Sequence, residues 1–235
     1  FYFYFLYYIN KVLTMKKEFL KFVLLAGFVF ASGCSDDINK AVPPSTASRP
    51  TVPVLSNEIT IGNQIWMAKN LNISRYRNGD VIPQVQNASQ WSTINYGAWC
   101  YYENNSANGP IYGKLYNLAA IKDPRGLAPI GWHIPNDDEW TTLFLTLGGF
   151  SSGGQLKSTN WWEAPNTGAT NSSFFAALPG GKRDGDAGTF LTIGQQGNWW
   201  SRSLSSGGDG NYYRLFYNLG DIGAGSSYAQ FGYSV

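Results

Sequence analysis

Short apolar runs separated by turns rich in Gly, Asn and Asp restrict the fold of this chain more than any other feature. Residues 59–61, 64–67 and 98–102 are such runs, and we expect each to form a strand. Only two stretches carry the longer helical spacing, too few for a doubly wound sheet. The pattern therefore predicts an α+β domain with two helices, short antiparallel strands and long loops rich in Gly, Trp and Tyr.

Of the two predicted helices, the one that begins near Asn136 has the clearer boundaries. Asn136 and Glu139 have the spacing of a capping box, in which each side chain binds the backbone N–H of the other residue. Apolar side chains then follow at helical spacing: Trp140, Leu143, Phe144 and Leu147. Gly148 and Gly149 supply a left-handed stop. The other helix is predicted over residues 114–121, with an inward face of Leu115, Leu118 and Ala119.

The N-terminal part carries the signals of an exported lipoprotein. Residues 1–14 precede Met15, a suitable initiator, and are interpreted as translated upstream sequence that is not structural. Residues 15–33 combine a lysine pair with a short apolar run and small residues, as a lipoprotein signal peptide does. We therefore expect lipidation at Cys34, with an ordinary signal peptide as the alternative. The apolar run is far shorter than the roughly 20 residues of a membrane-spanning helix.

The segment that follows is expected to be a flexible tether. Residues 34–57 are rich in Pro, Ser, Thr and Ala and have no apolar periodicity. Asp36 and Asp37 resemble the acidic tag that sends lipoproteins of Bacteroides-like bacteria to the outer face of the outer membrane. The sequence thus predicts a lipid anchor, a tether and a globular head over residues 58–235, located at the bacterial outer membrane and exposed on the cell surface.

The charge balance argues against nucleic acid and anionic membranes as main partners. The chain has 17 Lys and Arg against 15 Asp and Glu, but residues 1–34 hold four of the Lys and one of the Glu. The remainder is near-neutral and has no basic block. We expect no nucleic-acid partner, and contact with a membrane through the lipid anchor only.

Four motifs in a fixed order resemble the Fibrobacter succinogenes major paralogous domain. They are residues 61–72 (IGNQIWMAKNLN), 112–117 (YGKLYN), 131–140 (GWHIPNDDEW) and 197–201 (GNWWS). The resemblance spans residues 58–235 and implies a C-type-lectin-like fold, related to that of formylglycine-generating enzymes, in secreted or lipid-anchored bacterial proteins. It also implies that the chain stops a few residues short of an Arg-Cys pair, whose cysteine would bond to Cys100. The alternative for Cys100 is a small buried hydrophobic residue.

No catalytic or metal site emerges from the residues, and we predict a non-catalytic protein without a cofactor. His133 is the single histidine, which excludes a zinc site built on several His ligands. We interpret it as part of a folding motif rather than as a general base. The active-site cysteine pair of formylglycine-generating enzymes is missing from the sequence. Residues 163–166 interrupt the Glu-Pro-Asn triplet of calcium-binding C-type lectins, and residues 184–186 are interpreted as a surface turn.

Residues 203–229 are the candidate ligand-binding region. Of these 27 residues, 17 are Ser, Gly, Tyr or Asn, as in antibody paratopes, where Tyr gives large contacts and the small residues give adaptable polar ones. The predicted ligand-binding residues in and beside this region are Trp200, Arg202, Tyr212, Tyr213, Arg214, Tyr217 and Tyr228. The expected partner is a protein or glycan on another cell, a phage or a host surface. The alternative is that these aromatic residues complete the core.

The same region fits diversification by a retroelement. Relatives of this domain include the variable proteins of diversity-generating retroelements, in which AAY codons mutated at adenine cannot yield Lys, Glu, Gln, Trp or Met. Residues 203–229 lack all five of these residue types. We therefore hypothesise that a retroelement rewrites this region.

Two other functions remain open from the sequence. The first is a carbohydrate-binding module that stacks sugar rings on the pairs Trp161-Trp162 or Trp199-Trp200. The second, with less support, is an envelope enzyme that uses Glu163 or Asp184, which would require a cleft with perturbed carboxylates.

Overall fold

The structure, a computed structural model, describes residues 58–235. The predictions for residues 1–14, 15–33 and 34–57, with lipidation at Cys34, lie outside the described residues. Within the described range, every helix falls short of the length and apolar character that crossing a bilayer requires.

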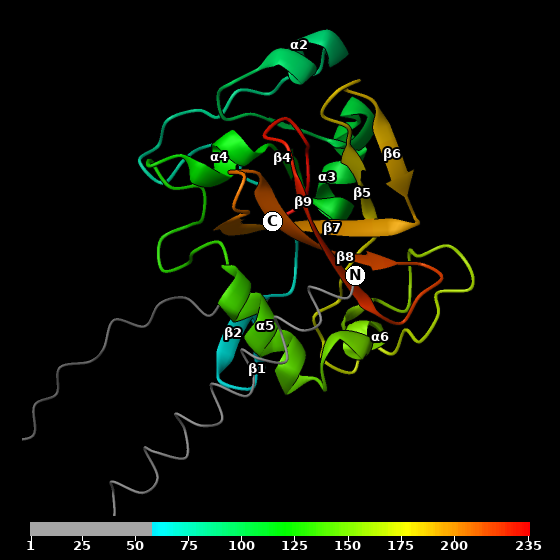
Figure 1. The fold of residues 1–235 in the computed structure, drawn as a ribbon. Coiled ribbons are helices and arrows are strands. Elements are labelled where there is room, and N and C mark those ends of the chain that lie inside the picture. The colour runs from blue at the N-terminus through cyan, green and yellow to red at the C-terminus, as the bar shows by residue number, and fades with distance from the viewer. Residues whose placement is uncertain (1–57) are drawn as a thin grey trace, which may run out of the picture. The chain divides into compact units, whose positions relative to one another are not determined.

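The largest sheet in residues 58–235 is mixed and has five strands (Figure 1). Its strands are β5 (Gly180–Arg183), β6 (Phe190–Ile193), β7 (Gln196–Leu204), β8 (Gly210–Phe216) and β9 (Ile222–Ser227). Their spatial order is β6-β5-β7-β8-β9, and all neighbours are antiparallel except β5 and β7, which run parallel. The strand β9 therefore forms one edge of this sheet.

Two small antiparallel sheets come from the first part of the domain. They pair β1 (Glu58–Ile61) with β2 (Gln64–Met67), and β3 (Trp99–Cys100) with β4 (Leu115–Tyr116). The strands β1 and β2 match two of the strands predicted from the apolar runs, whereas β3 covers only two residues of the predicted strand 98–102. Together with the helices, the sheets confirm the predicted mixed α+β class.

The helices of the described residues are short. They are α2 (Ala88–Thr93), α3 (Gly109–Tyr112), α4 (Leu118–Lys122), α5 (Asp137–Thr146) and α6 (Gly153–Leu156), with the 3-10 turns η1 (Tyr102–Asn104), η2 (Ser106–Asn108) and η3 (Phe150–Ser152). The prediction of two helices was therefore too low. The missed helices α2, α3 and α6 have at most six residues, too few to show helical periodicity.

The helix α5 forms as predicted, including its capping box. The Asn136 side chain accepts a hydrogen bond from the Glu139 N–H at 2.9 Å, and the Glu139 carboxylate accepts one from the Asn136 N–H at 2.9 Å. Gly148 and Gly149 follow with positive φ, as a left-handed stop requires. Trp140 and its helical neighbours bury one face of α5 against the sheet.

The predicted helix over residues 114–121 is wrong in its first half. Residues 115–116 form β4, because they pair with β3. The helix α4 begins only after Asn117, whose side chain accepts a hydrogen bond from the N–H of Ala120 at 3.1 Å. Pairing with a strand distant in sequence thus overrides the local helical spacing.

The C-terminal segment links the five-stranded sheet to β4. Residues 232–234 form isolated bridges with β4, β5 and β7. The Tyr233 ring packs on Trp200, with 4.5 Å between ring centroids, and on Tyr212, with 4.7 Å. The segment therefore covers part of one sheet face beside β8.

The two faces of β7 and β8 lie in different core clusters. Trp199 and Tyr213 are register partners and belong to the cluster around α5. Trp200 and Tyr212 are the next partners, and their side chains join the cluster that includes the C-terminal segment. Consecutive aromatic residues of one strand thus point to opposite faces of the sheet.

Candidate functional site

Two of the predicted ligand-binding residues belong to the core instead. Trp200 is 0% exposed, and its indole N–H donates to the carbonyl oxygen of Tyr116 at 2.8 Å. Tyr213 is 7% exposed and packs on Trp140 and Phe144. The alternative interpretation, in which the aromatic residues complete the core, therefore holds for these two side chains.

The other five predicted residues are at least partly accessible. Arg202 and Tyr228 are exposed, and Tyr228 keeps 58% of its surface. Tyr212, Arg214 and Tyr217 are half-buried. Of these five, Tyr212 and Arg214 are in direct contact, whereas Arg202 lies on β7 and Tyr228 follows β9. Tyr217 follows β8 and packs against the core cluster of α5, on the opposite face of the sheet.

A row of side chains on β8 forms the best-defined part of this region. Tyr212, Arg214 and Phe216 alternate along the strand and so lie on one face. The Arg214 Nη1 donates to the Tyr212 hydroxyl at 3.3 Å. The guanidinium carbon lies 4.9 Å from the centroid of the Phe216 ring and 5.8 Å from that of Tyr212. We call these three residues the β8 row. Sequence reasoning missed Phe216, which period-two spacing along a strand could have found.

Two glycines of β9 make room for the β8 row. Gly223 is the register partner of Arg214, and Gly225 that of Tyr212. A Cβ atom at Gly223 would lie 3.0 Å from the Arg214 Cγ and Nε, and one at Gly225 would lie 2.9 Å from the Tyr212 hydroxyl. The Arg214 and Tyr212 side chains therefore lean across β9, which larger residues would prevent. The Gly-x-Gly spacing in a predicted strand is the sequence signal for this arrangement.

The Arg214 guanidinium lacks a carboxylate partner among residues 58–235. Its Nε is buried and makes no hydrogen bond. Its single side-chain hydrogen bond in the described domain is the one to Tyr212. A guanidinium has five N–H donors, so four of them form no hydrogen bond to residues 58–235.

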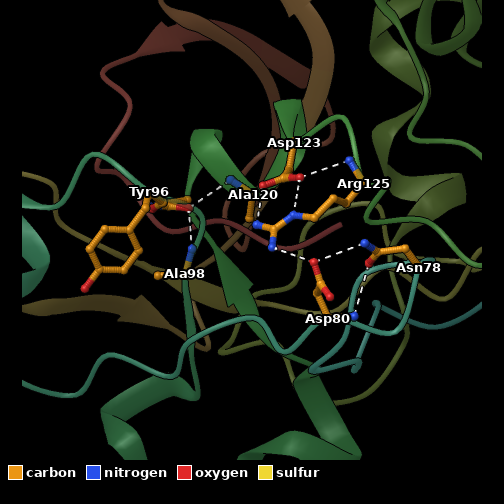
Figure 2. Close-up of polar contacts among 8 residues, drawn as sticks. Asn78, Asp80, Tyr96, Ala98, Ala120, Asp123 and Arg125 are labelled. Carbon is orange, nitrogen blue, oxygen red and sulfur yellow. Dashed lines mark hydrogen bonds and ion pairs between the residues drawn. The ribbon is translucent and has the colours of Figure 1, made fainter.

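The Arg125 guanidinium, by contrast, forms hydrogen bonds to two carboxylates. Arg125 donates to both carboxylate oxygens of Asp123, at 2.9 and 2.8 Å, and to Asp80 at 3.0 Å (Figure 2). The Arg125 hydrogen bonds hold the pKa of the Asp123 carboxyl down, at about 2. This network borders a recess of about 440 Å³ lined by Tyr96, Lys122 and other residues. One guanidinium is thus held by two carboxylates, and we interpret the network as a clamp between loops.

Two further cations are buried and held by backbone carbonyls. Arg183 donates to the carbonyl oxygens of Val85, Gln86 and Gly188, at 2.6, 2.8 and 2.9 Å. Lys157 donates to two carbonyls at the turn between β8 and β9. Arg214 thus differs from these cations, because it has neither a carboxylate nor a set of carbonyl acceptors.

Neither tryptophan pair presents two exposed indole faces on which sugar rings could stack. Trp162 and Trp199 are buried, like Trp200, and their indole N–H groups bond to Ala177 and Asn70. Trp161 alone is exposed, at 55%, from a backbone position with φ of 76°. The carbohydrate hypothesis in its paired form is therefore contradicted, because sugar rings need accessible indole faces.

The remaining candidate residues make structural contacts. Glu163 accepts a hydrogen bond from Gln195, and Asp184 accepts from two backbone N–H groups of its own turn. The interpretation of 184–186 as a turn is confirmed. His133 is exposed, and its Nε2 lies 2.6 Å from the Glu139 carboxylate of the capping box. Across the part of the chain that the structure describes, no three His, Cys, Asp or Glu residues gather to hold a metal ion.

Cys100 is a free, fully buried thiol in a third core cluster. Burial raises the pKa of this thiol to about 12. It packs within this core cluster, and the buried Arg183 guanidinium beside it opposes part of the rise in pKa.

Comparison with known proteins identifies the domain. The family model described as Fibrobacter succinogenes major domain matches residues 59–231. No curated protein and no solved structure matches the chain. The matched range includes the β8 row and the glycines of β9.

Proposed function

We propose that this chain, which belongs to the Fibrobacter succinogenes major domain family, is a non-catalytic cell-surface binding module. Its ligand, in this proposal, is a protein or glycan on another cell, a phage or a host surface. The binding face consists of the β8 row together with Arg202 and Tyr228. Its rigid support is the five-stranded sheet, which is packed on α5 from the other side.

One observation carries the proposal: an arginine without a counter-ion lies between two partly accessible aromatic rings on a sheet face. Arg and Tyr are enriched among residues that dominate binding energy, because they combine apolar area with directed hydrogen bonds. The nearby turn at 205–209 is rich in Ser and Gly, and the turn at 217–221 contains Asn218 and Gly220; small residues of these types supply adaptable contacts.

The proposal also covers the fold type and the cellular location of the protein. We propose that the mixed α+β domain is of the C-type-lectin-like type, and that Cys34 is lipidated and anchors the protein in the outer membrane. Labelling of growing cells with a palmitate analogue tests the anchor. A Cys34→Ser variant that still incorporates the label would refute it.

The binding role is tested with the full chain purified in detergent. It is screened against an array of bacterial and host glycans and against a random peptide library on phage. We expect the retained ligands to lose at least about tenfold in affinity on Tyr228→Ser, about 1.4 kcal/mol. The matched control is Tyr96→Ser, because Tyr96 is also an exposed tyrosine but lies beside the recess near Arg125. Equal losses for the two variants, or no retained ligand at all, would contradict the proposal.

Diversification by a retroelement is tested by sequencing the locus in related isolates. If this hypothesis is right, substitutions concentrate at template adenines and at accessible positions such as Asn218 and Tyr228. Buried positions such as Ile222 are spared, because substitution there disrupts the core. A C-terminal region without substitutions would refute diversification and leave a fixed ligand.

A further inference from the structure

We propose that the ligand is an extended polypeptide segment that pairs with the outer edge of β9 and places a carboxylate on Arg214. This inference rests on the proposed function and specifies the chemistry of its ligand.

The first support is the unused bonding capacity of Arg214. No carboxylate of residues 58–235 pairs with the Arg214 guanidinium. Its Nε is buried and has no acceptor, and its one side-chain hydrogen bond within the described residues is the 3.3 Å bond to the Tyr212 hydroxyl. Two parallel N–H groups match the two oxygens of a carboxylate, and a charged acceptor gives the stronger hydrogen bond. The group that completes this site is therefore an anion with planar, paired oxygens.

The second support is the direction in which the β8 row leans. Arg214 lies against Gly223, and the Tyr212 hydroxyl lies over Gly225, so both side chains extend over β9. The side chains of an added strand would continue this face beyond β9. An acidic side chain opposite Gly223 would then lie beside the Arg214 guanidinium.

The third support is the edge itself. β9 is the last strand of the sheet, and no described strand pairs with its outer side. The segment 222–227 (IGAGSS) contains no charged residue and no Pro, the devices by which edge strands resist pairing. Free N–H and C=O groups along such an edge bind extended peptides by strand addition. This feature favours a polypeptide over an acidic glycan, which offers no matching backbone donors and acceptors.

The test follows the Arg214 Nε–H signal and the backbone N–H signals of β9 by NMR in the full chain labelled uniformly with ¹⁵N. The signal is assigned by its loss in Arg214→Lys. The probes are the capped peptide Thr-Val-Glu-Val-Thr, its matched Gln version, and an oligogalacturonate as an acidic glycan. We expect the Glu peptide to shift the Nε–H signal and the backbone N–H signals of β9, and to bind at least tenfold more tightly than the Gln peptide.

The variants separate a binding role from a folding role. Arg214→Gln should reduce the preference for the Glu peptide to near unity, and Arg214→Lys, which keeps the charge but not the paired donors, should reduce it in part. If Arg214→Gln does not fold, Arg214→Lys with an unchanged melting temperature carries the comparison.

Several outcomes would overturn the inference. Equal binding of the Glu and Gln peptides, or β9 signals that do not move, would exclude it. A shift caused by oligogalacturonate but not by the Glu peptide would exclude the polypeptide. A ligand from the array or the phage library that is sensitive to Tyr228→Ser but not to Arg214→Gln would leave the proposed function standing and refute this inference alone.

Discussion

The side-chain ammonium of Lys157 lies 3.0 Å from the carbonyl oxygen of Phe216, although Lys157 is fully buried. The same ammonium donates to the carbonyl oxygen of Leu219 at 2.9 Å. Lys157 therefore links the end of β8 to the middle of the turn between β8 and β9, next to the β8 row. Burial lowers the pKa of this lysine to about 8, because the charged form loses its hydration.

The lowered pKa predicts a specific pH dependence of stability. Between about pH 8 and pH 10 the unfolded lysine binds a proton and the buried one does not, so the free energy of unfolding rises with pH, by at most about 1.4 kcal/mol per pH unit. Below pH 8 both states are protonated and the contribution is flat. Denaturant unfolding of the wild type and Lys157→Met at several pH values measures the difference.

The difference in stability between the wild type and Lys157→Met removes the effect of other titrating groups, because these groups are the same in both proteins. Burial raises the pKa of Tyr116 and Tyr233, which lowers stability above about pH 10 in both proteins. At pH 7 the variant should be less stable by about 1–3 kcal/mol, because two carbonyl groups lose their donor. Parallel pH profiles for the two proteins would contradict the assignment.

A second prediction concerns the reactivity of Cys100. Because burial raises its pKa to about 12 and removes it from solvent, the native thiol should resist alkylation by iodoacetamide at neutral and mildly alkaline pH. In denaturant it should react fully. Mass spectrometry of the peptide that contains Cys100 measures both states separately from Cys34. Alkylation of the native protein at the denatured rate would show that this cluster opens readily.

A third prediction tests the cap of α5. Asn136→Ala removes the acceptor for the Glu139 N–H and should lower the free energy of unfolding by about 1 kcal/mol. Asn218→Ala is the control, because Asn218 is exposed and its substitution should change stability by less than about 0.5 kcal/mol. Chemical unfolding of the two variants measures both effects, and equal changes would exclude a specific capping role.

The sequence predicted the elements whose formation depends on residues close together in the chain. The capping box at Asn136 and the stop at Gly148 act within a few residues, and the helix between them forms as expected. The error over residues 114–121 has the opposite origin. Helical spacing there was outweighed by pairing between β4 and β3, which contact each other only after the chain has folded back.

The candidate site shows the same limit. The composition of residues 203–229 located the region, but it could not tell which of two adjacent tyrosines faces outward. Tyr212 and Tyr213 are separated by the alternation of β8 and by its register with β7, which buries Trp200 as well. The sequence also could not predict that Arg214 has no carboxylate partner among the described residues, because the distance to the nearest carboxylate depends on the three-dimensional structure.

The last prediction tests the room that β9 leaves for the β8 row. Gly225→Ala would place a methyl group 2.9 Å from the Tyr212 hydroxyl and 3.0 Å from its ring, closer than normal contact. The Tyr212 ring, which packs on Tyr233, must then move, at a cost of about 1–3 kcal/mol. Gly220→Ala is the matched control, because nothing lies within 4 Å of its added methyl group.

The two substitutions should differ in their effect on the free energy of unfolding and on the NMR signals of the β8 row. Gly220→Ala should be neutral or slightly stabilising, because it reduces the freedom of the unfolded chain. Gly225→Ala should in addition perturb the NMR signals of Tyr212 and of its contact Arg214, while those of the buried Tyr213 on the opposite face stay near their wild-type positions. If Gly225→Ala were as stable as Gly220→Ala and left the Tyr212 signals unchanged, Tyr212 would not lie over β9, and the support for strand addition at this edge would fall with it.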